Sequence, residues 1–231
     1  MQFSDSLNDE QREAVLHTHG PLLILAGAGS GKTRVITSRI AYLVGDGHAK
    51  PDEVLAVTFT NKAAEEMRTR VEALLGSDCS RMWVSTFHSL CARLLRREAP
   101  AIGLSRDFVI YDSSDQLTVV KQALKALQID DSFIQPRAAL SRISQAKNRM
   151  EGPDDMAGAA GWNRRDEQIA KVYAHYLAAL KDSNALDFDD LLLKTVELFE
   201  QSERVAHEVR ARSSGSSWWT NTRTPTGRNT C

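Results

Sequence analysis

The chain has 231 residues, of which 42% are hydrophobic and 26% charged, so it can bury a substantial core and belongs to the globular class. Its 29 basic and 30 acidic residues leave a formal net charge of −1, which neither indicates nor excludes a nucleic-acid partner. Its three cysteines form no Cys-x-x-Cys pair, which argues against a disulfide framework and favours a reducing compartment.

The N-terminal segment lacks the basic and apolar regions of a secretion signal. No later run approaches the roughly 18 apolar residues that a membrane-spanning helix requires. We therefore expect a cytoplasmic protein with no membrane partner.

Strand-like and helical patterns alternate along the first half of the chain. Apolar runs of strand length occur at residues 22–25, 54–59, 82–85 and 108–111. Helical patterns follow them at residues 32–43, 62–75, 87–97 and 114–127. This alternation predicts a parallel α/β sheet. Since such sheets bind ligands beyond the carboxyl ends of their strands, the loops at 26–32, 58–62 and 86–88 should face one site.

The first apolar run leads directly into a glycine-rich turn. That turn consists of Ala26, Gly27, Ala28, Gly29, Ser30, Gly31, Lys32 and Thr33. Such a turn points backbone N–H groups at phosphates, while Lys32 reaches the β/γ oxygens and the Thr33 hydroxyl binds Mg²⁺. Ala26 replaces the usual first glycine, but Gly29 and Gly31 remain for close backbone approach. The pattern predicts a nucleoside triphosphate site; the alternative is a simple strand-to-helix turn.

Strand signals vanish beyond residue 112. Residues 116–127, 138–148 and 166–181 have amphipathic helical patterns, with a glycine-rich break at 152–161 before the last of them. We expect an ATP-binding core at 1–112, a helical subdomain at 113–183 and a return to the core at 184–212. A further helix begins near residue 187 with Asp187, Asp189 and Asp190 in its first turn. Because only Asp187 and Asp190 share a helix face, they favour capping over a metal cluster.

Four further segments accompany the phosphate loop. They are residues 7–14, 57–67, 85–90 and 187–191. In this order and spacing they resemble the motifs of UvrD/Rep-type superfamily 1 DNA helicases, and the resemblance covers residues 5–212. It implies an α/β P-loop NTPase fold of the RecA-like kind, with a parallel sheet and an inserted helical subdomain.

The resemblance also implies ligands and site residues. It favours ATP with Mg²⁺, since a glutamine placed like Gln11 reads adenine through its amide. The implied nucleotide-binding residues are Gln11, Ala26, Gly27, Ala28, Gly29, Ser30, Gly31, Lys32, Thr33 and Arg34, with Lys32 and Thr33 as catalytic residues and Thr33 as the metal ligand. The implied DNA contacts are Thr58, Phe59, Thr60, Asn61, Lys62, Thr86, Phe87 and His88.

The resemblance implies single-stranded DNA and its junctions with duplex as partners, with DNA repair or replication proteins as further partners. Taken alone, Phe59 would more often be a core residue, His88 an ordinary loop histidine and Gln11 an exposed helix residue.

One part of the family pattern is missing. These ATPases hold Mg²⁺ and orient the attacking water with an Asp-Glu pair at the end of a later strand, and no such pair ends a predicted strand here. Residues 213–231 instead lose all apolar periodicity and are expected to be disordered.

The tail suggests a reason for this absence. Back-translated and read from the third base of each codon, Trp218, Trp219 and Thr220 require Val-Asp. Permitted choices at degenerate positions extend this to Val-Asp-Glu-Tyr-Gln-Asp-Thr-Asn-Arg-Pro-Gln-Tyr-Leu, which resembles the missing motif. We therefore hypothesise a frameshift or sequencing error near codons 211–217, with the alternative that the tail is genuine.

The resemblance implies an ATP-dependent helicase that moves 3′ to 5′ on single-stranded DNA and unwinds duplex. Because the Asp-Glu pair is missing, we expect this chain alone to bind nucleotide without unwinding. Two alternatives stay open: a non-catalytic remnant that binds nucleotide or DNA, and another P-loop ATPase or kinase.

Overall fold

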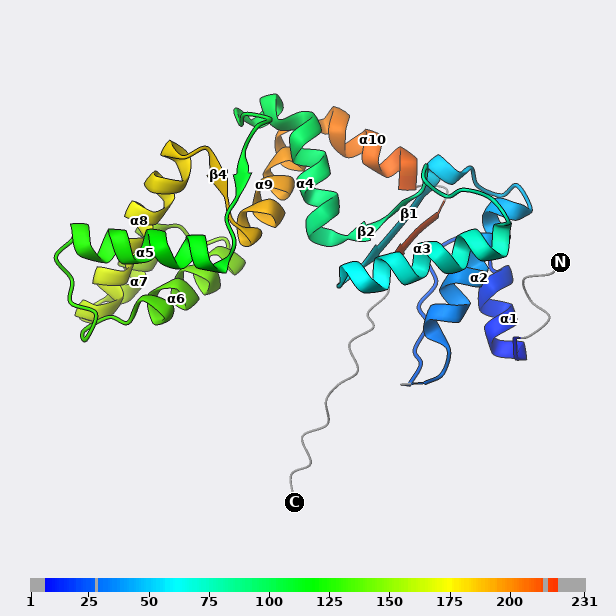
Figure 1. Ribbon diagram of the computed structural model, residues 1–231, viewed down its shortest axis with the longest axis horizontal. Coiled ribbons are helices and arrows are strands. Elements are labelled where there is room, and N and C mark those ends of the chain that lie inside the picture. The colour runs from blue at the N-terminus through cyan, green and yellow to red at the C-terminus, as the bar shows by residue number, and fades with distance from the viewer. Residues whose placement is uncertain (1–6, 28, 214–215, 220–231) are drawn as a thin grey trace, which may run out of the picture. The chain divides into compact units, whose positions relative to one another are not determined.

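The computed structural model describes residues 7–27, 29–213 and 216–219, with side chains up to residue 209 (Figure 1). The chain forms two compact units, the first comprising residues up to Leu90 and from Arg204 onward, and the second comprising Cys91–Glu203. The boundaries expected after residues 112 and 183 both fall inside the second unit. The reason is that two short strands flanking them, β3 (Val109–Ile110) and β4 (Ala185–Leu186), pair with each other there.

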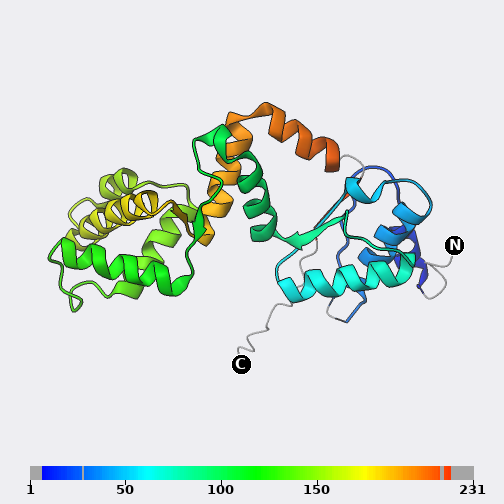
Figure 2. The same ribbon diagram turned by 45° about the horizontal axis from the view of Figure 1, so that its top comes forward.

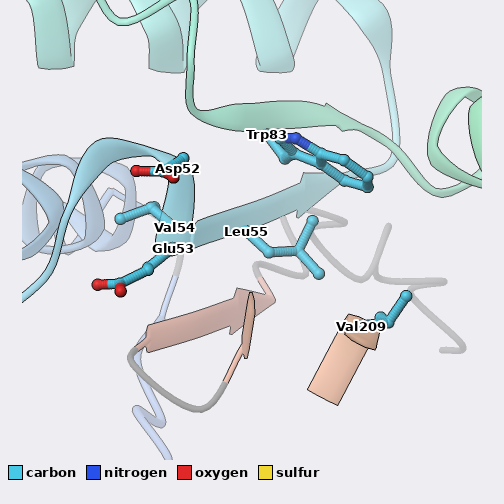
Figure 3. A pocket seen from close by; sticks show the side chains of 6 residues that line it. All are labelled: Asp52, Glu53, Val54, Leu55, Trp83 and Val209. Carbon is cyan, nitrogen blue, oxygen red and sulfur yellow. The ribbon is translucent and has the colours of Figure 1, made fainter. Parts of the chain in front are cut away.

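A three-stranded parallel sheet underlies the first unit. Its strands are β1 (Val54–Thr58), β2 (Trp83–Thr86) and β5 (Ser216–Trp219), in the order β2-β1-β5. Leu55 lies opposite Trp83 in register, so the two side chains share a face of the sheet. Together with Val209 of α10 (Glu203–Ser213) they line a small cavity of about 10 Å³ (Figure 3).

Helices α1 (Asp9–Leu16), α2 (Lys32–Gly45) and α3 (Asn61–Leu75) belong to the first unit, and α4 (Phe87–Glu98) starts in it. The turn η1 (Pro51–Glu53) precedes β1. Helix α3 starts where Thr60 accepts a hydrogen bond from the Ala63 N–H, and it stops at Gly76, whose φ of 64° suits glycine. The core joins α2, β1, α3 and β2 through Ile40, Leu43, Val54, Ala56, Met67, Val71 and Val84.

The strand expected at residues 22–25 is not formed, since the described residues 21–27 contain no regular element. Its burial still alternates: Leu22 and Ile24 are half-buried, whereas Leu23 and Leu25 are 80% and 86% exposed. Ile24 packs on the small cluster of Leu7, Val15 and Val35. The segment thus has the side-chain pattern of a strand, but it finds no ladder partner among the described residues, and partners are what stabilise a strand.

The second unit is mainly helical. It contains η2 (Ala99–Ile102), α5 (Ser113–Ala126), α6 (Pro136–Asn148), α7 (Pro153–Ala160), α8 (Arg164–Asp182) and α9 (Phe188–Gln201). Figures 1 and 2 show α5 to α8, coloured green to yellow, packed side by side. Their core includes Val120, Leu124, Ile143, Ile169, Val172 and Tyr176.

Two expectations for irregular segments were wrong. Helix α7 occupies most of the glycine-rich break at 152–161, because Pro153 suits a first helical turn and the Asp155 carboxylate accepts the Gly152 N–H. The expected disordered tail contains β5, whose backbone pairs in parallel with β1. The remaining tail residues 214–215 and 220–231 lie outside the described residues.

The architecture is therefore a mixed helix and strand fold with short parallel sheets. The run at 108–111 contributes β3 to the second unit and does not extend the sheet of β1 and β2. Within the described part of the chain this is fewer strands than the full RecA-like sheet that we expected.

Candidate nucleotide-binding site

Two glycines of the glycine-rich loop adopt a left-handed backbone conformation. Gly29 and Gly31 adopt φ values of 76° and 82°, in the left-handed region that side chains other than glycine rarely enter. The Ser30 hydroxyl closes the loop by donating to the Gly27 carbonyl over 2.7 Å. Ala26 and Gly27 are exposed at its start, and Ala28 lies outside the described residues.

Helix α2 begins at Lys32, directly after the loop. Gly31 is its N-cap and provides no side-chain hydrogen bond, so the N–H groups of the first turn lack a capping acceptor from that residue. The positive end of the helix dipole lies at the same place. Loop and helix together are therefore suited to bind an anion such as a phosphate.

The Lys32 side chain folds back over the loop. Its ammonium donates to the Ala26 carbonyl at 2.8 Å and to the Gly27 carbonyl at 2.6 Å. Neutral carbonyls are weaker acceptors for a cation than phosphate oxygens, so a phosphate in the loop would compete for these hydrogen bonds. Thr33 is half-buried in the first turn and Arg34 is exposed beside it.

Gln11 reaches the same loop from α1. Its Nε2 donates to the Ser30 carbonyl over 3.0 Å. Its Oε1 accepts the Asn8 N–H at 3.2 Å, while Asn8 Oδ1 accepts the Gln11 N–H at 2.8 Å, which forms a capping box. A side-chain amide has two N–H donors and two acceptor positions, so Gln11 retains one of each for a base edge.

The loops after β1 and β2 lie next to each other, because Thr58 and Thr86 are register partners at the ends of their parallel strands. The rings of Phe59 and Phe87 are 6.2 Å apart with an interplanar angle of 57°. Phe59 is 43% exposed, whereas Phe87 is half-buried. An exposed aromatic face supported by a second ring is a suitable platform for a nucleic-acid base.

The polar residues of these two loops differ in accessibility. Thr58 is fully buried and donates to the Thr60 carbonyl, and buried Thr86 shares a 2.8 Å hydrogen bond with the Ser89 hydroxyl. Thr60 is exposed and caps α3, as described above. Asn61 and Lys62 are exposed and His88 is half-buried. The accessible polar groups are thus Thr60, Asn61, Lys62 and His88, while Thr58 and Thr86 hold the loops in place.

In the second unit, the expected capping role of Asp187 is confirmed. Asp187 is the N-cap of α9; its carboxylate accepts the Asp190 N–H at 2.8 Å, and Asp190 accepts the Asp187 N–H at 3.2 Å. Among the described residues no group of three or more His, Cys, Asp or Glu side chains is arranged to hold a metal ion.

A buried lysine joins this capping pair, and our sequence analysis did not identify it. Lys147 of α6 is 1% exposed, and its ammonium lies 2.6 Å from Asp187 and 2.7 Å from Asp190. The Tyr176 hydroxyl also donates to Asp187 over 2.8 Å. The signal in the sequence was the position of Lys147 on the apolar stripe of α6, next to Ala139, Ile143 and Ala146.

Burial shapes the ionisation of this cluster. Burial disfavours a charged Asp187, but the Lys147 ammonium and the hydrogen bonds outweigh it and lower the pKa below 3.8. For Asp190, burial, assisted by the charge of Asp187, raises the pKa above 3.8 despite Lys147. Burial also raises the pKa of Tyr173 to about 12 and that of Tyr176 further.

Helices of the described part of the chain are too short or too polar to cross a membrane.

Comparison with known proteins identifies the family. The model of the UvrD/REP helicase N-terminal domain matches residues 7–214. The ATP-dependent DNA helicase PcrA of Bacillus subtilis is 48% identical over 204 residues, which is 88% of this chain and 28% of that protein. PcrA of Leuconostoc citreum is 51% identical over 204 residues, or 88% of this chain and 27% of the relative.

PcrA of Staphylococcus aureus is 49% identical over 199 residues, which is 86% of this chain and 27% of that protein. The chain thus spans little more than a quarter of the length of these relatives. The motifs of the phosphate loop and of the two strand-end loops all lie within the matched region. The chain belongs to the UvrD/REP helicase family and corresponds to its N-terminal domain.

Proposed function

We propose that this chain is the ATP-binding portion of a DNA helicase that moves 3′ to 5′ on single-stranded DNA and unwinds duplex at its junctions. The observation that carries the proposal is the phosphate loop, with Gly29 and Gly31 in the left-handed conformation, Lys32 at the start of α2 and Gln11 bonded to Ser30. The PcrA relatives, named as ATP-dependent DNA helicases, support it. For such an enzyme we propose DNA repair or replication proteins as partners and the cytoplasm as its location, because both accord with a DNA substrate.

In this proposal the loop binds the triphosphate and α1 recognises the base. Lys32 exchanges the carbonyls of Ala26 and Gly27 for β/γ oxygens, and N–H groups of the first turn of α2 donate to the same phosphates. The Thr33 hydroxyl would hold Mg²⁺, and the bound ion would neutralise phosphate charge. Gln11 uses its remaining donor and acceptor on the adenine edge.

The loops after β1 and β2 form the proposed DNA contact. Phe59, supported by Phe87, stacks on a base, whereas Asn61, Lys62 and His88 bond phosphates. Stacking and phosphate contacts do not depend on base identity, as a translocating enzyme requires. Thr58 and Thr86, being buried, act as supports for these loops.

We further propose that the 231-residue polypeptide, assayed alone, binds nucleotide without unwinding DNA. No strand within residues 7–27, 29–213 and 216–219 ends in an Asp-Glu pair that could hold the metal and orient the attacking water. Lys32 and Thr33 can bind phosphate and Mg²⁺, but they do not complete stabilisation of the transition state. DNA-stimulated ATP hydrolysis by the pure polypeptide would contradict this part of the proposal.

The direct test is titration with a fluorescent ATP analogue in the presence of Mg²⁺. Replacing Lys32 with alanine removes a charge-assisted hydrogen bond to phosphate and should weaken binding at least about tenfold. Lys50→Ala is the matched control, because Lys50 is an exposed lysine whose ion pair with Glu53 spans 4.0 Å. Equal affinities of wild type and Lys32→Ala would refute the assignment of the loop.

Because no described strand ends in an Asp-Glu pair, a second candidate is a non-catalytic remnant that binds DNA. Anisotropy of a labelled oligo-dT separates the readings. If the DNA surface of a helicase is intact, Phe59→Ala should bind the oligo-dT more weakly than the wild type does. The loss of one stacked base should cost about 1–3 kcal/mol of binding free energy. If the chain is a remnant whose nucleotide loop has no role, ATP should not change the affinity for DNA, either in the wild type or in Lys32→Ala. An unrelated P-loop kinase predicts no DNA binding at all.

A further inference from the structure

Helix α2 carries a buried arginine, Arg39, whose side chain contacts α1. Arg39 lies seven residues beyond Lys32, or two helical turns and about 10 Å along the axis. Only 2% of its surface is exposed, although arginine is among the residues least often buried. Its guanidinium Nη1 donates to the carbonyl oxygen of Ala14, in the last turn of α1.

This hydrogen bond meets a specific need of α1. The helix has 8 residues, fewer than an isolated helix needs to be stable in water, and its last turn contains no basic residue. The carbonyls of a last turn lack donors within the helix and form the negative end of its dipole. Arg39 supplies both a donor and a positive charge from a neighbouring helix. Burial lowers the pKa of Arg39 to about 10, which leaves it charged at neutral pH.

The apolar contact between the two helices has few fully buried members. Val15 of α1 packs with Val35 of α2 and with Leu7, and partly buried Ala14, Ile24 and Tyr42 pack against these three. Apolar packing is not directional, so a cluster of this size allows α1 to shift along α2 at modest cost. A directional hydrogen bond from a buried guanidinium fixes the position of α1.

The position of α1 decides where Gln11 lies. Gln11 and Ala14 are three residues apart and so nearly aligned along the helix. Gln11 reaches the Ser30 carbonyl at 3.0 Å, and a Cβ placed on Gly31 would be 3.1 Å from Gln11 Nε2. At such close approach, a small displacement of α1 would break the contact between Gln11 and the loop.

We propose that Arg39 is a positioning residue for base recognition: it holds α1 against α2 so that Gln11 lies at the phosphate loop. The inference rests on the proposed nucleotide-binding function. It divides nucleotide recognition into two parts. The loop and Lys32 bind the phosphates independently of Arg39, whereas recognition of the base through Gln11 depends on it.

The test compares three ligands, ATP, GTP and inorganic tripolyphosphate, by isothermal titration with Mg²⁺. Arg39→Met keeps an unbranched apolar stem in the same place but removes the guanidinium, and with it the hydrogen-bond donor and the positive charge. We expect it to reduce the preference for ATP over GTP as much as Gln11→Ala does, about three- to tenfold for one hydrogen bond, with tripolyphosphate affinity unchanged. Arg39→Lys retains the charge and should recover part of the preference.

Two further measurements separate positioning from general stability. Val71→Ala, in α3 and fully buried, is the control for a weakened core; it should lower stability without changing the ATP to GTP ratio. Hydrogen exchange without nucleotide should accelerate in residues 9–16 of Arg39→Met and stay unchanged in β1 and α3.

Each outcome decides between the proposals. Loss of ATP preference together with faster exchange in α1 supports the role of Arg39. If Gln11→Ala loses the preference and Arg39→Met keeps it, or if exchange in α1 is unaffected, the positioning role is overturned and the nucleotide site stands. If the wild type binds neither ATP nor tripolyphosphate, the proposed function fails, and base recognition through Arg39 fails with it.

Discussion

Replacing Lys147 with methionine should destabilise the second unit strongly, because it removes the cation from a buried cluster. The ammonium lies 2.6 Å and 2.7 Å from two carboxylates, and the three side chains are 1%, 3% and 10% exposed. Methionine has a similar length but leaves Asp187 and Asp190 without a neutralising cation, while the Tyr176 hydroxyl and two backbone N–H groups still donate to them. Breaking a buried ion pair by removing one partner costs about 3–5 kcal/mol, so we expect a loss in that range.

Lys171→Met is the matched control. Lys171 forms an ion pair of similar length, 2.8 Å, with Glu167 on α8, but both side chains are half exposed. Exposed pairs contribute about 0–1 kcal/mol, so this variant should unfold almost like the wild type. The two variants remove the same group from pairs of similar geometry and differ mainly in burial.

Urea denaturation followed by circular dichroism measures the free energy of unfolding, and hydrogen exchange locates the change. Since the chain has two compact units, exchange in α6 and α9 reports on the second unit separately. We expect faster exchange in these two helices for Lys147→Met. A loss below about 1 kcal/mol, or one equal to that of Lys171→Met, would refute the reasoning from burial.

Three further predictions concern other parts of the molecule. Gly31→Ala should weaken ATP-analogue binding, because φ is 82° and the new Cβ would press on Gln11; circular dichroism should show an otherwise intact fold. Thr60→Ala should cost about 0.5–2 kcal/mol in urea unfolding through loss of the α3 cap, whereas Thr60→Ser should retain most of it. The lowered pKa of Asp187 adds stability above pH 3.8 that is lost on acidification, while the raised pKa of Asp190 has the opposite sign. Asp190→Asn should therefore make unfolding free energy fall more steeply as pH drops through 3.8; an unchanged slope would contradict this assignment.

Local patterns predicted most helices and two strands of the first sheet. The helical spacing at residues 62–75 corresponds to α3, with Ala64, Met67 and Val71 buried on one face. The spacing of those buried residues follows the 3.6-residue period of the helix, and this period can be recognised from nearby residues alone. The phosphate loop was equally predictable, because positive φ angles at Gly29 and Gly31 follow from the absence of a side chain.

Other features required partners distant in the sequence. The run at 22–25 has a strand pattern but no ladder partner in the described residues, and β5 pairs with β1 although its composition suggested disorder. Pairing of strands depends on which backbone edges meet, and the sequence of a single segment does not indicate its partner. The pairing of β3 with β4 joins segments about 75 residues apart, and no local pattern indicated it for the same reason.

The amino-acid sequence by itself determined the family, and it predicted the phosphate loop and the proposed base contact of Gln11, because their chemistry resides in residue types at fixed short spacings. Tertiary structure decided which of those groups are available. It buries Thr58 and Thr86, leaves Phe59 exposed beside Phe87, and joins Lys147 to Asp187 across 40 residues. It also connects Arg39 to Ala14. Burial and hydrogen bonding between distant segments arise only when the packed chain excludes water, so no local pattern could specify them.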